Sequence, residues 1–376
     1  MSAQAASVSA PTRGLAARLP VFPWDLLAPA AALARTHRDG VVDLSIGTPV
    51  DDVPDVVQAA LARAANSPGY PPVVGTPELR EAAAGWFARS LAVDVSPDAI
   101  LPTIGSKELI SWLPTLLGLG PADTVVIPEL AYPTYDVGAR VAGCQVLVTD
   151  STAAVGPARV ALVWLNSPSN PTGQVLPPEH QAKVVAWARE RGAIVVADEC
   201  YVELGWTEQP VSVLHPSVCG GSHEGLLSVQ SLSKRSNLAG YRAGVVAGDP
   251  ALVEVILAAR KHVGLMVPGP VQAAAAAAFG DDSHVAVQKA RYAARRTALL
   301  AALTASGFTI SHSEAGLYLW ATRDESCWDT VDWLARRGIL VAPGEIYGPT
   351  GGRHVRFALT ATDERIAAAV ARLSAP

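Results

Sequence analysis

The sequence predicts an α/β fold, with a large, doubly wound, mostly parallel sheet domain and a smaller α+β domain. Short runs rich in Val, Ile and Leu recur between helix-like segments. These runs are continuously apolar rather than alternating, which is typical of strands covered on both faces. The chain has 376 residues, enough for two domains of about 100 to 200 residues each.

Six apolar runs define the expected large sheet. They are DTVVIPE (123–129), QVLVTD (145–150), VALVWLN (160–166), AIVVADE (193–199), GLLSVQS (225–231) and AGVVAGD (243–249). Between two of them, residues 177–192 predict an amphipathic helix with Val184, Val185 and Ala188 on one face. This alternation of strands and helices predicts a doubly wound architecture.

The pattern changes after residue 280. Residues 281–307 predict a long charged helix that ends at Gly307. The shorter elements that follow are strand-like or helical, at 308–313, 316–322, 329–337, 338–343 and 354–360, before a final helix. Strands and helices in this order are typical of a smaller α+β domain.

These patterns predict how the chain divides into domains. We expect the large domain over residues 46–280. The small domain would combine residues 1–45 with residues 281–376, and the Ala- and Ser-rich residues 1–18 would be mobile.

Composition excludes several classes of protein. Half of the residues are hydrophobic and the net charge is −5, which argues against disorder and against nucleic acid as a partner. No apolar run is long enough to span a membrane, and no secretory signal is recognisable. The four cysteines are scattered without metal-binding spacing. We therefore expect a cytoplasmic protein with free thiols, no metal and no membrane contact.

Polar residues follow three of the expected strands, where an open α/β sheet binds its ligands. They are Asn166, Asp198 and the segment Ser231 to Lys234. Lys234 is one of only five lysines in the chain. In a cavity at a strand end, loss of solvent favours the neutral amine, the form that attacks a carbonyl group. Considered alone, a lysine in this position is more often structural or solvated.

Groups suited to a phosphate surround the lysine. Ser231, Ser233 and Arg242 offer hydroxyl and guanidinium donors. A second anion site is predicted at Gly105 and Ser106, which open a helix in LPTIGSKELISW; free backbone N–H groups there attract anions. The alternative for Ser106 is an ordinary helix N-cap.

An acid and two amides complete the candidate set. Asp198 ends an apolar strand, where a carboxylate is costly without a partner; the protonated ring nitrogen of a cofactor would provide one. Tyr201 adds a phenol three residues later. Asn166 and Asn170 lie in a proline-rich turn that is rigid enough to aim a side chain.

The segments NSPSNPTG, DECY, SLSKRSNLAGYRAG and HVRFALT resemble, in order and spacing, the motifs of class I/II aminotransferases. These are fold-type I enzymes that depend on pyridoxal 5′-phosphate. The resemblance extends from about Asp43 to Leu373. It implies that the chain is an enzyme with this cofactor.

The resemblance implies a role for each residue near the cofactor ring. Lys234 would hold the cofactor as a Schiff base and later move the substrate proton. Asp198 would keep the pyridine nitrogen protonated. Asn170 and Tyr201 would donate hydrogen bonds to the phenolic oxygen. Tyr132 would stack on the ring, its alternative being core packing.

The resemblance also implies which groups bind the phosphate. They are Gly105, Ser106, Lys107, Ser231 and Arg242, with Ser233 beside them as a further candidate.

The remaining implied residues contact the substrate or the partner subunit. Arg356 would clamp the substrate α-carboxylate with its planar fork of donors, together with Asn170; without the other motifs Arg356 would be a surface arginine on an edge strand. Gly47 would line the same carboxylate through its backbone. Tyr70 would reach the phosphate of the neighbouring subunit, which implies a homodimer with shared active sites.

Other enzyme classes fit less well. Ser231 and Lys234 also satisfy the S-x-x-K pattern of one class of serine hydrolase, but its K-T-G and S-x-N elements do not occur. A nicotinamide dehydrogenase would need G-x-G-x-x-G after a strand. A non-catalytic relative would be expected to lose the lysine. A pyridoxal-phosphate β-lyase or decarboxylase stays open, since the same residues hold the cofactor whichever bond breaks.

The substrate is suggested only by a closer resemblance. The stretches LPVFPWDLLAPAAALA, SKELISWLPTLLGLGP and SEAGLYLWATR are similar to the succinyldiaminopimelate transaminase subgroup of high-GC bacteria. This implies exchange of an amino group between N-succinyl-L,L-2,6-diaminopimelate and 2-oxoglutarate, in diaminopimelate and lysine biosynthesis. Another amino acid substrate remains the alternative, because no motif identifies the group that binds the distal end.

Overall fold

A computed structural model describes residues 14–374 of the chain. The prediction of a mobile head over residues 1–18 falls mostly on residues 1–13, which lie outside the described residues. Within the described part, Leu15–Arg18 form a short 3-10 helix.

The large sheet has seven strands. Their order across the sheet is β2 (Ile100–Ile104), β8 (Ala243–Gly248), β7 (Leu226–Ser231), β6 (Ile194–Asp198), β5 (Val160–Asn166), β3 (Thr124–Ile127) and β4 (Gln145–Val148). All six strands predicted from apolar runs are present, and β2 completes the sheet. Strand β8 runs antiparallel to both of its neighbours, whereas the other pairs are parallel.

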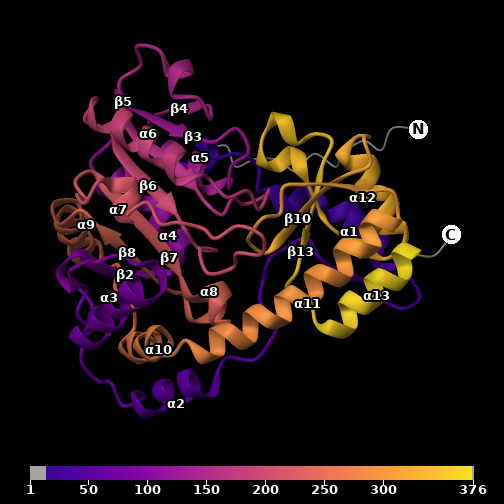
Figure 1. Ribbon diagram of the computed structural model, residues 1–376, viewed down its shortest axis with the longest axis horizontal. Helices are drawn as coiled ribbons and strands as arrows, with labels where there is room; N and C mark the ends of the chain where they lie inside the picture. Colours follow the sequence, from indigo (N-terminus) through magenta and orange to yellow (C-terminus); the bar gives the residue numbers. More distant parts are fainter. Residues whose placement is uncertain (1–13, 375–376) are drawn as a thin grey trace.

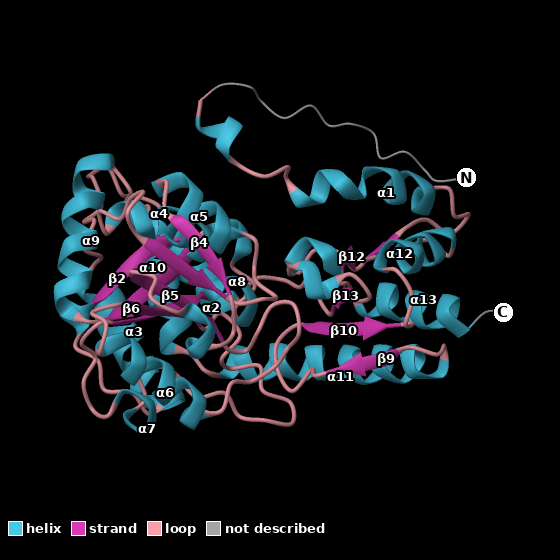
Figure 2. Ribbon diagram, turned by 90° about the horizontal axis from the view of Figure 1, so that it is seen from above, coloured by secondary structure: helices cyan, strands magenta, loops and turns pink. Residues whose placement is uncertain are grey.

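Helices cover the sheet on both faces, as Figure 2 shows from above. One face packs against α4 (Gly105–Leu116), α5 (Thr134–Ala142) and α9 (Pro250–Val263). The other face packs against α3 (Pro77–Leu91), α6 (Pro178–Arg189), α7 (Pro216–Cys219) and α10 (Gly269–Gly280). Because apolar side chains are buried on both faces of the inner strands, β5, β6 and β8 are nearly continuous apolar runs in the sequence, which is why they could be predicted.

The smaller sheet is antiparallel and has four strands. Their order is β12 (Ala342–Pro343), β13 (Val355–Ala358), β10 (Tyr318–Thr322) and β9 (Thr309–Ser311). Strand β1 (Val42–Asp43) pairs separately with β11 (Ile339–Leu340). The helices around these strands are α1 (Ala28–Arg35), α11 (Ser283–Ala305), α12 (Cys327–Arg336) and α13 (Asp363–Ser374). The predicted fold class is thereby confirmed.

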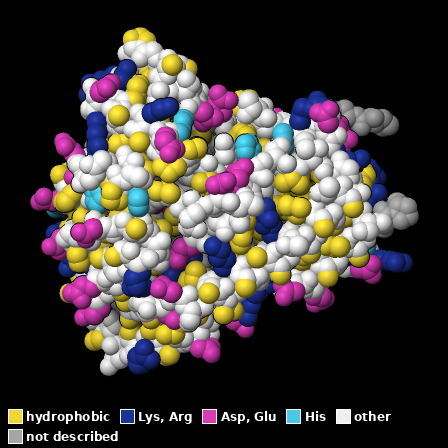
Figure 3. Space-filling view, viewed as in Figure 1, with side chains coloured by type: hydrophobic (Ala, Val, Ile, Leu, Met, Phe, Trp, Pro, Cys, Tyr) yellow, Lys and Arg dark blue, Asp and Glu magenta, His cyan; other side chains and the backbone are white. Residues whose placement is uncertain are grey.

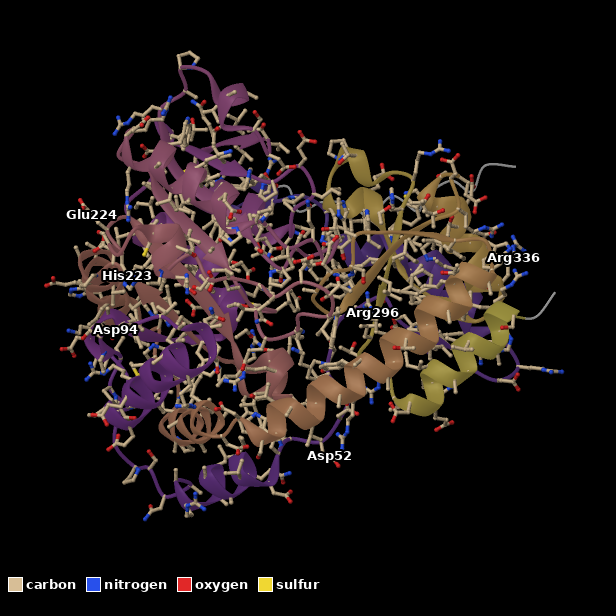
Figure 4. All side chains as sticks on the ribbon, in the orientation of Figure 1. Asp52, Asp94, His223, Glu224, Arg296 and Arg336 are labelled. Carbon is tan, nitrogen blue, oxygen red and sulfur yellow. The ribbon has the colours of Figure 1, made fainter. Side chains whose placement is uncertain are left out.

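The long helix α11 connects the two parts of the molecule, from the end of α10 to the smaller sheet (Figure 1). Arg295 on α11 forms a buried ion pair with Asp51, at 2.6 Å. Its neighbour Arg296 donates a hydrogen bond to the carbonyl of Ser313 at 2.8 Å. Figure 4 labels Arg296 on α11, and it labels Asp52 where the N-terminal part of the chain passes near the start of that helix. The exact domain boundaries, at residues 46 and 280, stay a prediction.

The surface carries mixed charge, with acidic and basic side chains interspersed over the face drawn in Figure 3. Over residues 14–374, no helix combines the length and the apolar character needed to cross a bilayer. In the same part of the chain, no three acidic, histidine or cysteine side chains converge as a metal site would require.

Candidate active site

The predicted site residues meet in a cavity of about 1000 Å³ at the carboxyl ends of β5, β6 and β7. Twelve of the fourteen line it: Gly47, Ser106, Lys107, Tyr132, Asn170, Asp198, Tyr201, Ser231, Ser233, Lys234, Arg242 and Arg356. Gly105 lies buried beneath Arg242, and Tyr70 lies elsewhere. The strand-end rule therefore located the cavity correctly.

Lys234 projects into this cavity from the short helix α8 (Leu232–Arg235), which follows β7 directly. Its Nζ donates a hydrogen bond to the carbonyl of Gly47. Burial lowers the pKa of the Lys234 amine; the nearby Tyr318 and Cys200 side chains oppose this shift, and the cations Arg356 and Arg242 add to it. Among the described residues no carboxylate lies within 4.0 Å of Nζ. These surroundings favour the neutral, nucleophilic amine.

Asp198 is the last residue of β6 and is buried. Its Oδ2 accepts from the Tyr135 hydroxyl at 2.8 Å, and Oδ1 accepts from the Cys200 N–H at 3.2 Å. Burial raises the pKa of this carboxyl group, although both hydrogen bonds lower it. No cation in residues 14–374 pairs with it, so a protonated ring nitrogen would be a fitting partner. The contact with Tyr135 was not predicted.

The two amides of the proline-rich turn have different tasks. Asn166 fastens the turn to the sheet: its Nδ2 donates to the carbonyl of Asp198 at 2.9 Å, and its Oδ1 accepts from the Asn170 N–H at 2.7 Å. Asn170 lines the cavity, and its Oδ1 accepts from Arg356 at 2.7 Å. The Asn170 amide nitrogen is thereby left as a donor toward a ligand.

Arg356 on β13 is a buried cation, with 2% of its surface exposed, so the surface-arginine alternative is wrong. Its two terminal nitrogens donate to Asn170 and to the carbonyl of Ser45, each at 2.7 Å, and its Nε is buried without a partner. The Tyr318 ring lies 3.8 Å from the guanidinium carbon. No carboxylate of residues 14–374 pairs with Arg356. A buried guanidinium in this condition suits a ligand carboxylate.

The anion site lies where α4 begins. The helix starts at Gly105 with Ile104 as its N-cap and no side-chain cap, so the alternative role of Ser106 as N-cap is wrong. The N–H groups of this first turn are free for a phosphate. Arg242 lies directly over Gly105, since a Cβ atom on that glycine would be 2.3 Å from Arg242 Nη2. Burial and the charge of Arg242 lower the pKa of Lys107.

Three tyrosines form another part of the cavity wall. The hydroxyl groups of Tyr201 and Tyr318 are 3.0 Å apart, and both side chains are buried. Burial raises the pKa of Tyr132 to about 12. Tyr132 lines the cavity, as its expected stacking role requires, and that role stays a prediction.

Glu199 follows Asp198 directly, does not line the cavity and is almost fully buried. Its carboxyl oxygens accept hydrogen bonds from Ser212, from the Val213 N–H, from Ser228 and from Gln230, at 2.6 to 3.1 Å. Burial raises the pKa of Glu199 to about 7, although these hydrogen bonds lower it. The sequence offered no signal for this network beyond the position of Glu199 next to Asp198.

The N-terminal segment contributes a wall that was not predicted. Phe22 and Trp24 line the cavity, and the indole nitrogen of Trp24 is buried without a partner. In Figure 2 this segment passes from α1 across to the side of α4 and α5. Tyr70, by contrast, lies between α2 (Asp55–Arg63) and α3 and is 96% exposed, away from the cavity of its own chain.

Together these features define a class of protein. A doubly wound sheet that brings a buried amine of lowered pKa, a buried acid and an anion site to its strand ends fits the aldehyde, ring nitrogen and phosphate of pyridoxal phosphate. Sequence comparison agrees, because residues 39–373 match the family model described as aminotransferase class I and II. The chain belongs to this pyridoxal-phosphate-dependent family, and the predicted family and cofactor are confirmed.

Individual relatives agree on the class, and of the two described here one has a substrate in its name. The chain is 62% identical over 368 residues to a probable aminotransferase, Rv1178, of Mycobacterium tuberculosis, covering 97% of this chain and 88% of that protein. It is 59% identical to the 4-dedimethylamino-4-oxo-anhydrotetracycline transaminase OxyQ of Streptomyces rimosus, covering 95% and 99%.

Among solved structures, the chain is similar to a probable N-succinyldiaminopimelate aminotransferase from Thermus thermophilus. The TM-score is 0.84 at 27% identity, covering 94% of this chain and 99% of that one. An aminotransferase from Neisseria meningitidis gives a TM-score of 0.86 at 29% identity, covering 96% and 97%.

Proposed function

We propose that the protein transfers an amino group between N-succinyl-L,L-2,6-diaminopimelate and 2-oxoglutarate, in diaminopimelate and lysine biosynthesis. The observation that carries the transfer of an amino group is Arg356, a buried cation without a carboxylate partner among residues 14–374, in the same cavity as Lys234, whose amine has a lowered pKa. An α-amino or 2-oxo acid provides the missing carboxylate. The similarity to the Thermus thermophilus protein supports the succinylated substrate.

The residues divide the chemical work between them. Pyridoxal phosphate, when bound, supplies a ring that accepts the electrons of the bond broken at the substrate Cα. Asp198 would hold a proton on the ring nitrogen, and Arg242, Ser231 and the first turn of α4 would hold the phosphate. Lys234 would hold the cofactor through Nζ, and its amine would remove and return the substrate Cα proton.

Arg356 and Asn170 orient the substrate by its α-carboxylate. A fixed carboxylate decides which Cα bond stands perpendicular to the ring and therefore breaks. With the C–H bond in that position, loss of the Cα proton is favoured over decarboxylation. The β-lyase alternative would begin with loss of the same proton and would differ in needing a leaving group on the substrate Cβ.

We also propose that the active enzyme is a homodimer with shared sites. Tyr70 is exposed and does not line its own cavity, which agrees with a role at the phosphate of the partner subunit. Its expected contribution is one hydrogen bond to that phosphate.

A second candidate substrate is a bulky polycyclic ketone. The 59% identity to OxyQ favours it, and so do the aromatic side chains Phe22 and Trp24, which would pack against an extended ring system. The two candidates share the amino donor half-reaction and differ in the acceptor.

A panel of substrates distinguishes these candidates. The purified enzyme is given glutamate as donor and then an acceptor: the 2-oxo form of the succinylated substrate, a tetracyclic ketone, or the oxo acids of aromatic and branched-chain amino acids. We expect the succinylated acceptor to have the highest kcat/KM. Equal values for aromatic or branched-chain acceptors would refute the substrate, and a preference for the tetracyclic ketone would establish the second candidate.

A further inference from the structure

Tyr318 occupies a position in the site that none of the predicted roles explains. It begins β10 and is 3% exposed. Its hydroxyl lies 3.0 Å from that of Tyr201, and its ring lies 3.8 Å from the guanidinium carbon of Arg356. One side chain thus contacts the groups proposed to bind the cofactor oxygen and the substrate carboxylate.

The backbone around Tyr318 is shaped to admit its hydroxyl group. A Cβ atom on Gly47 would lie 2.3 Å from the Tyr318 hydroxyl oxygen, so any larger residue at that position would displace the Tyr318 ring. The carbonyl of the same glycine accepts from Lys234 Nζ. The phenol of Tyr318 therefore lies in a close-packed position between Gly47 and Tyr201.

We propose that Tyr318 is a positioning residue whose hydroxyl donates to Tyr201 and whose ring supports Arg356, so that one side chain aligns both halves of the site. This inference rests on the proposed function. A phenol oxygen that accepts a hydrogen bond becomes a better donor through its own O–H, because hydrogen bonds in a chain polarise one another. Tyr318 would thereby direct the Tyr201 proton toward the phenolic oxygen of the cofactor.

The proposed contact has a measurable consequence at Lys234. Donation by Tyr201 withdraws negative charge from the cofactor oxygen, so the neighbouring Lys234 nitrogen holds its proton less tightly and its pKa falls. Without the Tyr318 hydroxyl this donation weakens, and the pKa should rise. The rise should be roughly half to one unit, the effect of one ordinary hydrogen bond.

The test is a pH titration of the visible absorption band of the cofactor bound to Lys234. It compares the wild-type enzyme with Tyr318→Phe, Tyr201→Phe and the double variant. We expect Tyr201→Phe to raise the pKa more than Tyr318→Phe does. Because Tyr318 acts through Tyr201, we expect the double variant to match Tyr201→Phe. If the pKa shifts of the two single variants add up in the double variant, the proposal that Tyr318 acts through Tyr201 would be overturned.

Two further variants separate the hydroxyl from the ring. Tyr318→Phe keeps the ring under Arg356, so KM for glutamate should change less than about twofold, whereas Tyr318→Leu removes the ring and should raise KM about tenfold or more. The matched control is Tyr347→Phe, a buried phenol 5.0 Å from Arg356 whose hydroxyl has no partner in the described part of the chain. The Tyr347→Phe variant should show the same pKa of the cofactor absorption band as the wild-type enzyme.

The outcomes separate this inference from the function on which it rests. A wild-type protein without a titrating cofactor band would overturn both. A normal wild-type titration with the same pKa in Tyr318→Phe would overturn the positioning role of the hydroxyl alone, and equal KM values for Tyr318→Leu and Tyr318→Phe would overturn the role of the ring.

Discussion

Replacing Arg356 by glutamine should abolish most of the activity while leaving the cofactor in place. Arg356 is buried, and the groups that hold it are Asn170, the Ser45 carbonyl and the Tyr318 ring. Glutamine can keep at most one of these contacts and carries no charge. The substrate carboxylate would then face neutral donors only, and its orientation would be lost.

The size of this effect follows from the hydrogen bonds that are lost. A hydrogen bond between two charged groups contributes about 1.5 to 3 kcal/mol, and a guanidinium can form two with one carboxylate. Their loss corresponds to about 3 to 6 kcal/mol of transition-state binding, or a fall in kcat/KM of about 150- to 25,000-fold. Lysine should not restore the rate, because it lacks the planar pair of donors.

The assay is the steady-state half-reaction with glutamate, combined with the cofactor absorption spectrum. Arg296→Gln is the matched control, since Arg296 donates one hydrogen bond to the Ser313 carbonyl and does not line the cavity. We expect the Arg356→Gln enzyme to keep the cofactor spectrum. A decrease in kcat/KM of less than about fivefold would refute the assignment of Arg356 to the substrate carboxylate.

Three other changes test the surroundings of the site. Gly105→Ala should weaken cofactor binding at least tenfold, because the new Cβ would meet Arg242 at 2.3 Å and the φ of +71° disfavours alanine; unchanged affinity by equilibrium dialysis contradicts this. Tyr70→Phe should also weaken cofactor binding about tenfold through the partner subunit, and an unchanged dissociation constant would argue against shared sites. Glu199 has a pKa of about 7 against its ordinary 4.5, so the folded protein binds more protons between these values and its stability from this group is lost as pH rises through that window. In the Glu199→Gln variant, the free energy of unfolding, measured with denaturant, should depend less on pH in this window. An unchanged slope would contradict the raised pKa of Glu199.

The large sheet could be predicted from sequence because burial on two faces leaves a continuous apolar signal. The runs at 160–166 and 193–199 match β5 and β6 closely. The antiparallel direction of β8 could not be predicted, because an apolar run carries no information about its direction. The strand-end rule then located Asp198 and Lys234 without any structure.

Contacts between segments that are far apart in the chain could not be predicted from the sequence. Tyr135 and Asp198 are 63 residues apart, and Tyr201 and Tyr318 are 117 residues apart. Tyr201 was predicted as a site residue, whereas Tyr318 lies in the apolar run GLYLWAT, which is typical of core packing. Nothing local distinguished the hydroxyl groups of Tyr135 and Tyr318. Phe22 and Trp24 follow a stretch that composition assigned to a mobile head, yet they line the cavity.

The most direct test of the account is to find which lysine bonds to the cofactor. The purified enzyme is reduced with borohydride, digested, and its peptides are analysed by mass spectrometry. Of the five lysines, we predict that Lys234 alone carries the cofactor, and that a Lys234→Arg protein folds but holds no covalently bound cofactor and does not transfer amino groups. A cofactor label on Lys107, or a Lys234→Arg enzyme that still transfers amino groups, would contradict the account.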